Sequence, residues 1–258
     1  AHARARGAVL LSAQNPPPAN VNFGQVGLEF SDLRPEGGAP VILADPPWRF
    51  GTWSQKGVTK KGAGGQYDCM ALEDIMRLPV ATLAAPDCCL WLWATNPMLP
   101  QALMVMSAWG FEFKTAGTWV KRSKLGKMLM GTGYVLRSCN EPFLLGVRGK
   151  PKVARPGWGA LLDPLDGDDM AELEVTLQAR RREHSRKPDA CFDAIDGMFP
   201  DSFGRRVELF SREARDGWRA WGNQTDKFPP RQVIFSRRMP SEFRAGRNEG
   251  AAVRLGHL

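Results

Sequence analysis

Short apolar runs alternate with segments of helical periodicity along the middle of the chain. Residues 41–44 and 88–93 are continuous apolar runs, as expected for strands that are buried on both faces. Residues 71–78 predict a short helix, and a proline marks the start of two more, 97–109 and 188–198. Further strands are predicted at 111–120, 142–147, 206–210 and 218–222. This order predicts an α/β fold with a mostly parallel, doubly wound sheet, in which ligands bind beyond the carboxyl ends of the strands.

The two ends of the chain lack this pattern. Residues 1–25 contain three successive prolines and little periodicity, and residues 229–258 are rich in basic side chains without an apolar face. We therefore expect a flexible N-terminal arm, one domain over 26–228 and a basic C-terminal tail. Within the domain, residues 155–180 carry an acidic run and are expected to be an insertion. The longest apolar run, 88–94, is too short to cross a bilayer, so no membrane partner is expected.

Basic residues are concentrated in two segments that have the composition of loops. The chain carries a net charge of +8, and between positions 114 and 152 nine basic residues accompany a single acid, Glu141. Residues 49–66 hold four basic residues and no acid. Mobile basic loops suit a polyanion, so a nucleic acid is the expected partner.

The cysteine and histidine content argues against a metal centre. Five cysteines include no Cys-x-x-Cys pair, and of three histidines only His184 lies away from the chain ends. Neither a disulfide framework, nor a zinc site, nor a Ser-His-Asp triad is predicted from this set, and no metal is expected. Reduced thiols suit an intracellular protein.

A motif that suits a flat aromatic amine follows the first predicted strand. Asp45, Pro46, Pro47 and Trp48 come directly after residues 41–44. Two prolines fix the backbone and remove two N–H donors, so a rigid turn presents a carboxylate beside carbonyl oxygens. We expect Asp45 and a carbonyl of the two prolines to accept the N–H groups of the amine, with Trp48 stacked on its ring. The remaining tryptophans in predicted strands or at a helix end are expected in the core: Trp91, Trp93, Trp109 and Trp119.

This arrangement favours attack by the amine nitrogen. The lone pair of an aromatic amine is delocalised into the ring, which makes the nitrogen a poor nucleophile. Holding both hydrogens out of the ring plane, with Asp45 beside the nitrogen, stabilises the positive charge that grows during attack. In-line positioning of donor and acceptor supplies the rest, an effect that reaches roughly 7–11 kcal/mol in favourable cases.

Further motifs, in a fixed order, make the chain resemble the MT-A type N6-adenine methyltransferases. This family includes the eukaryotic mRNA adenosine methyltransferases and bacterial and phage relatives. Beyond residues 45–48, the motifs are Tyr67, 90–95, 109–111, 119–121, Glu141 with 145–149, 185–189, 208–210 and 221–224. The resemblance covers residues 41–224 and implies a Rossmann-like S-adenosylmethionine-dependent methyltransferase fold, with the catalytic motif before the main cosubstrate-binding motifs.

The resemblance also implies a role for individual residues. Residues 45–48 match the adenine-binding catalytic motif, and Lys187 matches the lysine that meets the carboxylate of the cosubstrate. Positions matched to binding of S-adenosylmethionine are Glu208, Phe210, Arg212, Asn223 and Gln224. Positions matched to the target-base side are Arg49, Tyr67, Lys121 and Glu141. An ammonium directly before the helix predicted at 188–198 also suits an anion, because it adds to the positive end of the helix dipole.

The chain departs from the eukaryotic RNA enzyme of this family at two places. Ala214 and Arg215 stand where that enzyme has a histidine and an asparagine, so the ribose contacts must be made differently there. The cysteine-histidine zinc module that helps the eukaryotic enzyme to hold RNA is also missing from this sequence.

The resemblance and the charge together favour a DNA adenine-N6 methyltransferase of a bacterium or phage, acting in the cytoplasm on a flipped or single-stranded base. Methylation of adenosine in RNA is the alternative, because nothing in the motifs recognises the 2′-hydroxyl. A catalytically inactive nucleic-acid-binding partner subunit is a third reading, but the intact residues 45–48 and Lys187 argue against it. A simple basic nucleic-acid-binding domain would explain the charge, but it would explain neither the motif at residues 45–48 nor the one that contains Lys187. A homo- or heterodimer is left open.

Overall fold

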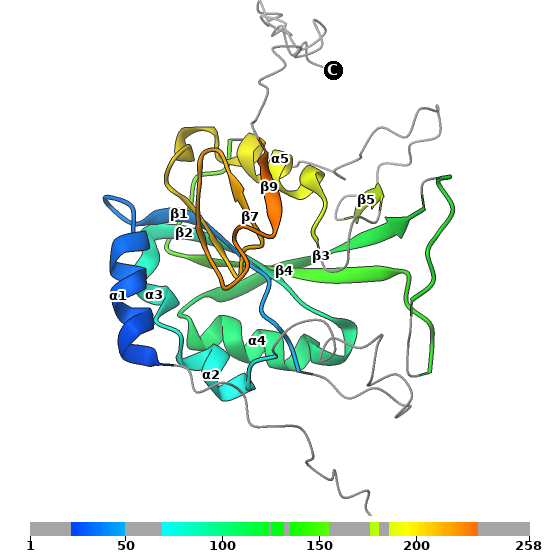
Figure 1. Cartoon of the computed structure of the whole chain (residues 1–258), viewed down its shortest axis with the longest axis horizontal. Coiled ribbons are helices and arrows are strands. Elements are labelled where there is room, and N and C mark those ends of the chain that lie inside the picture. The colour runs from blue at the N-terminus through cyan, green and yellow to red at the C-terminus, as the bar shows by residue number, and fades with distance from the viewer. Residues whose placement is uncertain are drawn as a thin grey trace, which may run out of the picture.

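The chain is described by a computed structural model over residues 22–49, 69–123, 125–131, 135–154, 176–180 and 186–231 (Figure 1). Several sequence predictions therefore lie outside the described residues. These are Tyr67, His184, almost all of the basic segment 49–66, and most of the predicted arm, insertion and tail. None of the helices in the described part of the chain combines the length and apolar composition needed to span a membrane.

A seven-stranded sheet forms the centre of the molecule, in the order β5-β3-β4-β2-β1-β6-β8. Its strands are β1 (Ala39–Ala44), β2 (Ala84–Trp93), β3 (Glu112–Arg122), β4 (Asn140–Arg148), β5 (Thr176–Arg180), β6 (Arg206–Leu209) and β8 (Trp218–Trp221). Strand β4 runs antiparallel to both of its neighbours, and the other four pairings are parallel. The predicted mostly parallel sheet is confirmed. A second sheet of two short strands pairs β7 (Glu213–Arg215) with β9 (Phe228–Arg231).

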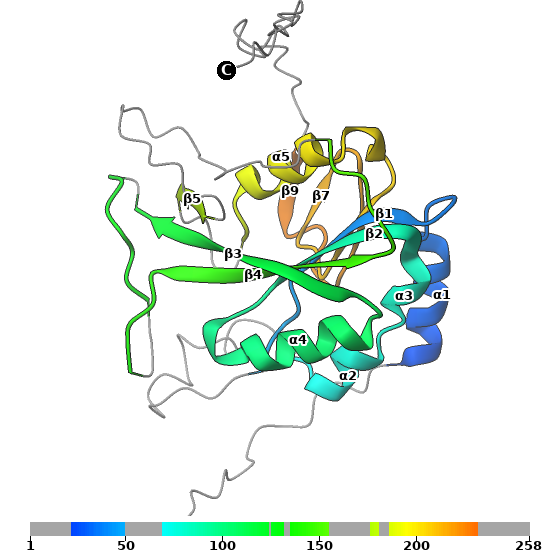
Figure 2. The same ribbon diagram turned by 180° about the vertical axis from the view of Figure 1, so that it is seen from behind.

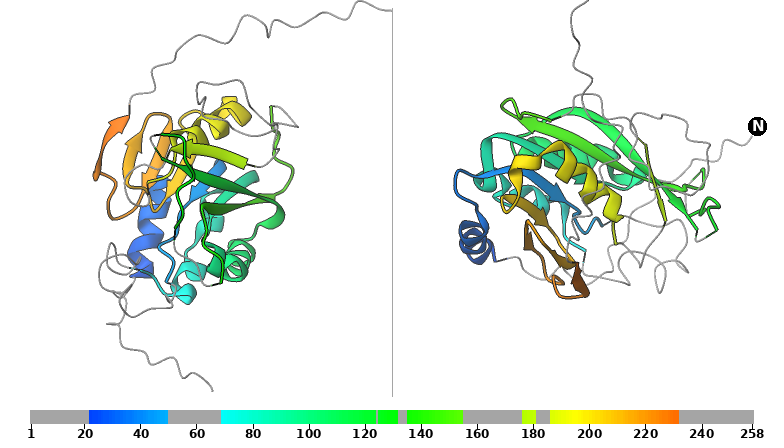
Figure 3. Two further views of the ribbon diagram at one scale, coloured as in Figure 1. Left: turned by 90° about the vertical axis from the view of Figure 1, so that its right-hand side faces the viewer. Right: turned by 90° about the horizontal axis from the view of Figure 1, so that it is seen from above.

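Helices cover both faces of the sheet. They are α1 (Phe23–Leu33), α2 (Leu72–Arg77), α3 (Val80–Leu83), α4 (Leu99–Ala108) and α5 (Asp189–Met198), with short 3-10 turns at Asn96–Met98 and Pro200–Ser202. Alternate residues of β1 point to opposite sides: Ile42 packs in the core beneath α1, α2 and α4, whereas Leu43 packs in the core beneath α5. Figures 2 and 3 show α5 and the β7–β9 pair on the opposite side of the sheet from α4. The doubly wound arrangement follows directly from the apolar run at 41–44, which must be buried on both faces.

Every predicted helix and strand has a counterpart in the structure, with shifted ends. The four tryptophans expected in the core are buried there: Trp91, Trp93, Trp109 and Trp119. Helix α1 was not predicted; Asn22 caps it by accepting a hydrogen bond from the backbone N–H of Gln25, and Phe30 anchors its apolar face. Strand β5 was not predicted either, and it occupies the last five residues of the expected insertion.

Candidate active site

The turn after β1 is fixed by its own backbone. The N–H of Trp48 donates to the carbonyl of Pro46 at 2.8 Å, and the N–H of Met70 donates to the carbonyl of Pro47 at 3.1 Å. The N–H of Asp45 donates to the carbonyl of Leu209 at 3.4 Å, which joins the carboxyl ends of β1 and β6. Each proline carbonyl therefore retains one lone pair, and Asp45 projects from the edge of the sheet where ligands of such folds bind.

Trp48 differs from its predicted role. Its side chain is 3% exposed, and its indole N–H donates to the carbonyl of Trp93 at 3.0 Å. The ring packs in the core beneath α2 and α4 because the turn directs it back toward the sheet. In this structure Trp48 therefore supports the turn from behind and does not present a stacking face for a base.

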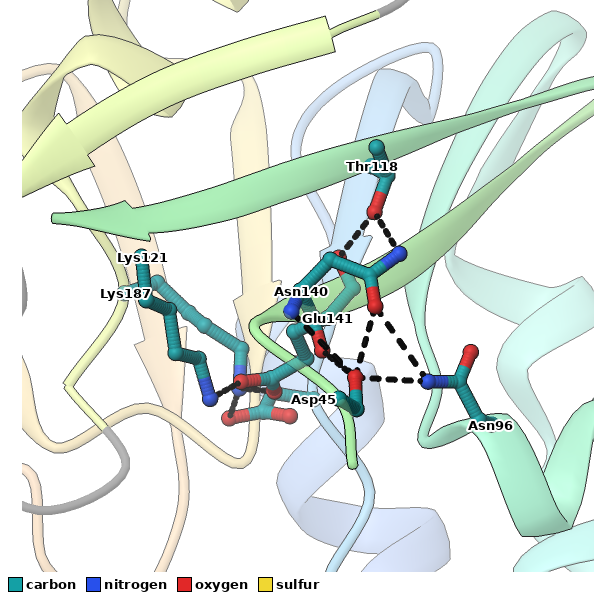
Figure 4. A network of polar contacts seen from close by, with 8 residues as sticks. Asp45, Asn96, Thr118, Lys121, Asn140, Glu141 and Lys187 are labelled. Carbon is teal, nitrogen blue, oxygen red and sulfur yellow. Dashed lines mark hydrogen bonds and ion pairs between the residues drawn. The ribbon is translucent and has the colours of Figure 1, made fainter. Parts of the chain in front are cut away.

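Asp45 is one end of a row of alternating charges (Figure 4). The ammonium of Lys187 lies 2.8 Å from an oxygen of Asp45 and 2.5 Å from an oxygen of Glu141. The other oxygen of Glu141 lies 2.7 Å from the ammonium of Lys121. Lys187, just before α5, thus binds carboxylates from the ends of β1 and β4, and only 7% of its side chain is exposed. The structure brings together one predicted cosubstrate residue, one predicted catalytic residue and two predicted base-side residues.

This row sets the order in which the groups titrate. Burial acts to raise the pKa of Glu141, but the ammonium groups of Lys187 and Lys121 outweigh it and lower that pKa to about 2. Burial and the charge of Glu141 raise the pKa of Asp45 above its ordinary value, against the opposing effect of Lys187. Burial also acts to lower the pKa of Lys187, yet Asp45 and Glu141 hold it above its ordinary value. On acidification Asp45 therefore takes up a proton before Glu141 does, and Lys187 stays protonated throughout.

A polar cluster holds the strand that carries Glu141. The amide nitrogen of Asn140 donates to the hydroxyl of Thr118 at 2.8 Å, and its amide oxygen accepts from the hydroxyl of Ser138 at 2.6 Å. The amide nitrogen of Asn96 donates to the hydroxyl of Ser138 at 2.9 Å (Figure 4). These contacts tie the start of β4 to β3 and to the turn after β2, so they fix the backbone beside Glu141. Sequence reasoning missed them because isolated Asn, Ser and Thr residues carry no spacing signal.

A second acid lies at the same edge of the sheet. Glu208 stands in β6, next to β1, and accepts a hydrogen bond from the hydroxyl of Ser211 at 2.9 Å. Burial raises the pKa of Glu208 to about 8, and the Ser211 hydroxyl only partly offsets this. Phe210 follows with a positive φ of 63°, a conformation that turns the chain sharply after β6. Its ring makes an edge-to-face contact with Trp221 in β8, with the centroids 5.4 Å apart.

The remaining predicted cosubstrate residues lie beyond β6 and β8. The guanidinium of Arg212 donates to the amide oxygen of Gln224 at 3.1 Å, which joins the two loops. Asn223 is exposed. Because β1, β6 and β8 are parallel neighbours, all three loops emerge at one edge, and the structure gathers Glu208, Arg212 and Gln224 on the Asp45 side.

A buried cluster of charges clamps the segment that carries Lys187. Glu213 in β7 is paired with both Arg186 and Arg215. Arg215 also donates to Asp189 at 2.9 Å, and its guanidinium lies 3.7 Å from the centre of the Phe192 ring. Arg186 and Asp189 flank Lys187, so β7 holds both sides of it. The sequence shows only that Arg215 departs from the family pattern, and its ion-pair partner Asp189 lies too far away in the chain for that contact to be predicted.

Arg49 is the remaining described residue among those predicted on the target-base side, and it is exposed. It lines an open pocket of about 440 Å³ together with Ala71, Leu72, Glu73, Pro97, Met98 and Gln101. Within the described ranges, no group of three or more His, Cys, Asp or Glu side chains is arranged to hold a metal ion.

Comparison with known proteins agrees with this geometry. The MT-A70 family model matches residues 40–224. The chain is 30% identical over 200 residues to the type II methyltransferase M.MunI from a Mycoplasma species, which covers 70% of this chain and 76% of that protein. It is 29% identical over 194 residues to the human N(6)-adenine-specific methyltransferase METTL4 and 27% identical over 203 residues to the human N(6)-adenosine-methyltransferase catalytic subunit METTL3.

These matches cover 73% and 77% of this chain, but only 38% and 30% of the two human proteins. The chain therefore spans less than two fifths of either human relative. The matched residues contain Asp45, Glu141, Lys187 and Glu208, the four charged groups gathered at the carboxyl edge of the sheet. The resemblance indicated by the sequence motifs is confirmed, and the chain belongs to the MT-A70 family of methyltransferases.

Proposed function

We propose that this protein transfers a methyl group from S-adenosylmethionine to the exocyclic N6 amine of adenine in DNA. The observation that carries the proposal is the Asp45 carboxylate, presented by a rigid turn and held at 2.8 Å by the buried ammonium of Lys187. A carboxylate and a proline carbonyl side by side match the two N–H groups of adenine. The ion pair directs that carboxylate toward the edge of the sheet.

Asp45 acts on the charge that grows on the amine nitrogen. The nitrogen becomes positive as it attacks, so a fixed anion beside it stabilises the transition state more than the ground state. Burial opposes this by raising the pKa of Asp45, and Lys187 counters that effect. Lys187 therefore favours the ionised form of Asp45 while it occupies one of the oxygens. The alkylated amine loses its proton only after transfer, so no strong base is needed.

The residues at the edge suit the proposed cosubstrate. S-Adenosylmethionine supplies, when bound, a methyl group on a cationic sulfur. The carboxylates Asp45 and Glu141 favour a cation there, while Lys187 at the start of α5 favours the carboxylate of the amino-acid part. Glu208 offers an acceptor for hydroxyl or amino hydrogens, and Gln224, whose amide oxygen already accepts from Arg212 and Lys227, offers its amide N–H groups as donors. This donor and acceptor set matches a zwitterionic, cationic nucleoside.

DNA is the proposed substrate on two grounds. The match to a type II methyltransferase extends over 76% of that protein, whereas the proteins named as adenosine methyltransferases match over less than a third of theirs. The chain also carries the net charge of +8 expected of a protein that binds a polyanion. RNA is the competing substrate, supported by the names of the adenosine methyltransferases among the relatives.

The test is a transfer assay with methyl-labelled S-adenosylmethionine and sequence-matched single- and double-stranded DNA and RNA. Digestion to nucleosides then identifies the labelled product. We expect labelled N6-methyldeoxyadenosine. Labelled N6-methyladenosine from RNA, with no labelled product from DNA, would show that the substrate is RNA and not DNA. Binding of S-adenosylmethionine without transfer to any adenine in a randomised sequence pool would favour the inactive partner subunit.

A further inference from the structure

Exposed apolar side chains gather on the segment between β3 and β4. We call residues 122–139 the β3–β4 arm; it projects from the end of β3 (Figure 1). Among the described residues, eleven large hydrophobic side chains are exposed, and five of them are on this arm. They are Leu125, Met128, Met130, Val135 and Leu136. Solvent-exposed apolar side chains in such density mark a binding surface.

The described residues on both sides of position 124 are joined by hydrogen bonds that hold the backbone of Leu125. The hydroxyl of Ser123 accepts from the N–H of Leu125 at 3.2 Å and from the N–H of Lys127 at 3.1 Å. The N–H of Ser123 donates to the carbonyl of Lys127 at 2.8 Å, and Gly126 supplies the positive φ of 75° that closes the turn. The backbone is thus fixed while 83% of the Leu125 side chain is exposed. A leucine on a rigid turn is ready to enter an apolar space without further ordering.

The charges around Leu125 identify the partner. Arg122, Lys127 and Arg137 lie on the arm, and residues 122–139 contain no acid. Arg122 donates to the carbonyl of Gly126 beside Leu125, and Arg137 donates to the carbonyl of Gly131 farther along the arm. A purely apolar protein surface would be a poor match for these cations. Nucleic acid offers both features required, phosphates for the basic side chains and base faces for the leucine.

The arm is joined directly to the active site. It begins at Arg122, the last residue of β3, and ends just before Asn140, the first residue of β4. Next to these ends, Lys121 and Glu141 form an ion pair 2.7 Å apart beside Lys187. The backbone of Lys121 also bonds both to Cys139 and to Leu129, so the base of the arm is closed. The base of the arm is therefore connected to Asp45 through Glu141 and Lys187.

We propose that Leu125 enters the base stack of the nucleic acid beside the target adenine and holds the strand open while the adenine occupies the site. The basic residues of the arm contact the phosphates on either side. This inference rests on the proposed function, because it takes the adenine as the group that leaves the stack. Its distinguishing consequence is that Leu125 matters most when the adenine is paired.

The experiment compares Leu125→Ala with Leu28→Ala, a matched control. Leu28 is also an exposed leucine, 66% accessible, and it lies on α1 at the opposite end of the molecule from the arm (Figure 1). Methyl transfer is measured on one DNA sequence in three forms: single strand, fully paired duplex, and duplex with the target adenine mismatched. For Leu125→Ala we expect kcat/KM on the paired duplex to fall about tenfold or more, with a change below about twofold on the other two forms. Leu28→Ala is expected to change none of them.

Two results would overturn the inference. One is an equal loss on all three forms, since a wedge is not needed where the adenine is already unpaired. The other is a shift in molar mass on light scattering caused by Leu125→Ala, which would assign the leucine to contact with a second copy of the chain.

A binding measurement separates this inference from the proposed function. A duplex with 2-aminopurine at the target position gains fluorescence when that base leaves the stack, with or without methyl transfer. We expect wild type and Leu28→Ala to raise the fluorescence and Leu125→Ala to raise it much less. Equal signals from all three proteins would refute the role of Leu125 even in an active enzyme. Loss of transfer in the wild type with the expected fluorescence pattern would refute the proposed function alone.

Discussion

The ammonium of Lys187 lies 2.8 Å from the carboxylate of Asp45, and the same ammonium is shared with Glu141. The pair joins the turn after β1 to the segment before α5, the two motifs that the sequence places at opposite ends of the α/β domain. Burial and the charge of Glu141 raise the pKa of Asp45 although it is ion-paired with Lys187. This relationship governs the behaviour of the whole site.

Asp45→Asn should remove methyl transfer while keeping the fold. Asparagine has the same shape and stays beside Lys187, but it has no charge to stabilise the attacking nitrogen. We expect kcat to fall by about 100-fold or more. Wild-type and variant proteins are compared by single-turnover transfer and by circular dichroism. Asp74→Asn, which changes an aspartate paired only with its helix neighbour Arg77, should retain activity. Comparable turnover in Asp45→Asn would remove Asp45 from the mechanism.

Glu141→Gln should destabilise the protein strongly. The substitution leaves the buried Lys187 with one carboxylate and removes the ion-pair partner of Lys121, so we expect a loss of about 3 kcal/mol in the free energy of unfolding at neutral pH. The control is Glu112→Gln, whose ion pair with Lys114 is exposed and should contribute less than about 1 kcal/mol.

The effect of Glu141→Gln has a defined pH dependence. The pKa of Glu141 is lowered to about 2 in the folded protein, so its stabilisation is present above the ordinary value of 4.5 and is lost as the pH falls toward 2. Urea unfolding at neutral pH and near pH 3 measures both effects. A difference between variant and wild type that does not shrink on acidification would contradict the assignment.

Glu208→Gln should stabilise the protein at alkaline pH. The pKa of Glu208 is raised to about 8, so between 4.5 and 8 the unfolded chain has lost a proton that the folded chain keeps. Wild-type stability therefore falls as the pH rises through this range, and the glutamine variant escapes that loss. Thermal unfolding at about pH 5 and about pH 9 should show a gain in Tm for Glu208→Gln over wild type only at the higher value. The exposed control Glu36→Gln should show no such crossover.

Arg215→Lys should weaken cosubstrate binding through the position of Lys187. Lysine keeps the charge but cannot bind Glu213 and Asp189 at once, so one side of the clamp around Lys187 is released. We expect KM for S-adenosylmethionine to rise several-fold with a smaller change in kcat. Asp189→Asn should act on the same contact, so the double variant should lose less affinity than the sum of the two single losses. Additive losses, or a fall in kcat alone, would assign the clamp to folding only.

Nucleic-acid affinity should fall steeply with salt, and the arm should contribute to the slope. If Arg122 contacts a phosphate, Arg122→Gln reduces the slope of log K against log salt by about 1. Arg77→Gln, on the exposed side of α2, should leave the slope unchanged. Fluorescence anisotropy over a salt series gives both slopes. Affinity that does not depend on salt would exclude phosphate contacts as the basis of binding.

The sheet and its two cores could be predicted because the signal is local. Residues 41–44 and 88–93 are apolar throughout, and a strand of that kind is stable only between two layers. Helix α1 and strand β5 escaped prediction for the opposite reason. Helix α1 is held by packing of Phe30 against Trp221 from β8, and β5 by backbone pairing with β3. Neither contact can be recognised in the local pattern of apolar and polar residues.

The sequence predicted which residues belong to the candidate site, but not how they are arranged. Asp45, Lys187, Glu141, Lys121 and Glu208 were assigned from motifs, and the structure gathers them at one edge. The ring of Trp48, on which a base was predicted to stack, is buried in this structure, since a rigid turn can direct a ring inward as well as outward. The clamp of Arg186, Glu213, Arg215 and Asp189 had no sequence signal.

The sequence by itself determined the family, the central sheet covered on both faces and the residue types at the site. These depend on apolar periodicity and on motifs that span only a few positions. Only the tertiary structure decided which charges share a partner, which of the two carboxylates beside Lys187 has its pKa raised and which has it lowered, and which leucine of the β3–β4 arm is exposed. Ion pairing and burial are properties of distance between residues far apart in the chain. The free energy of a charged side chain depends on those distances and on its desolvation. Neither can be deduced from the residue type alone.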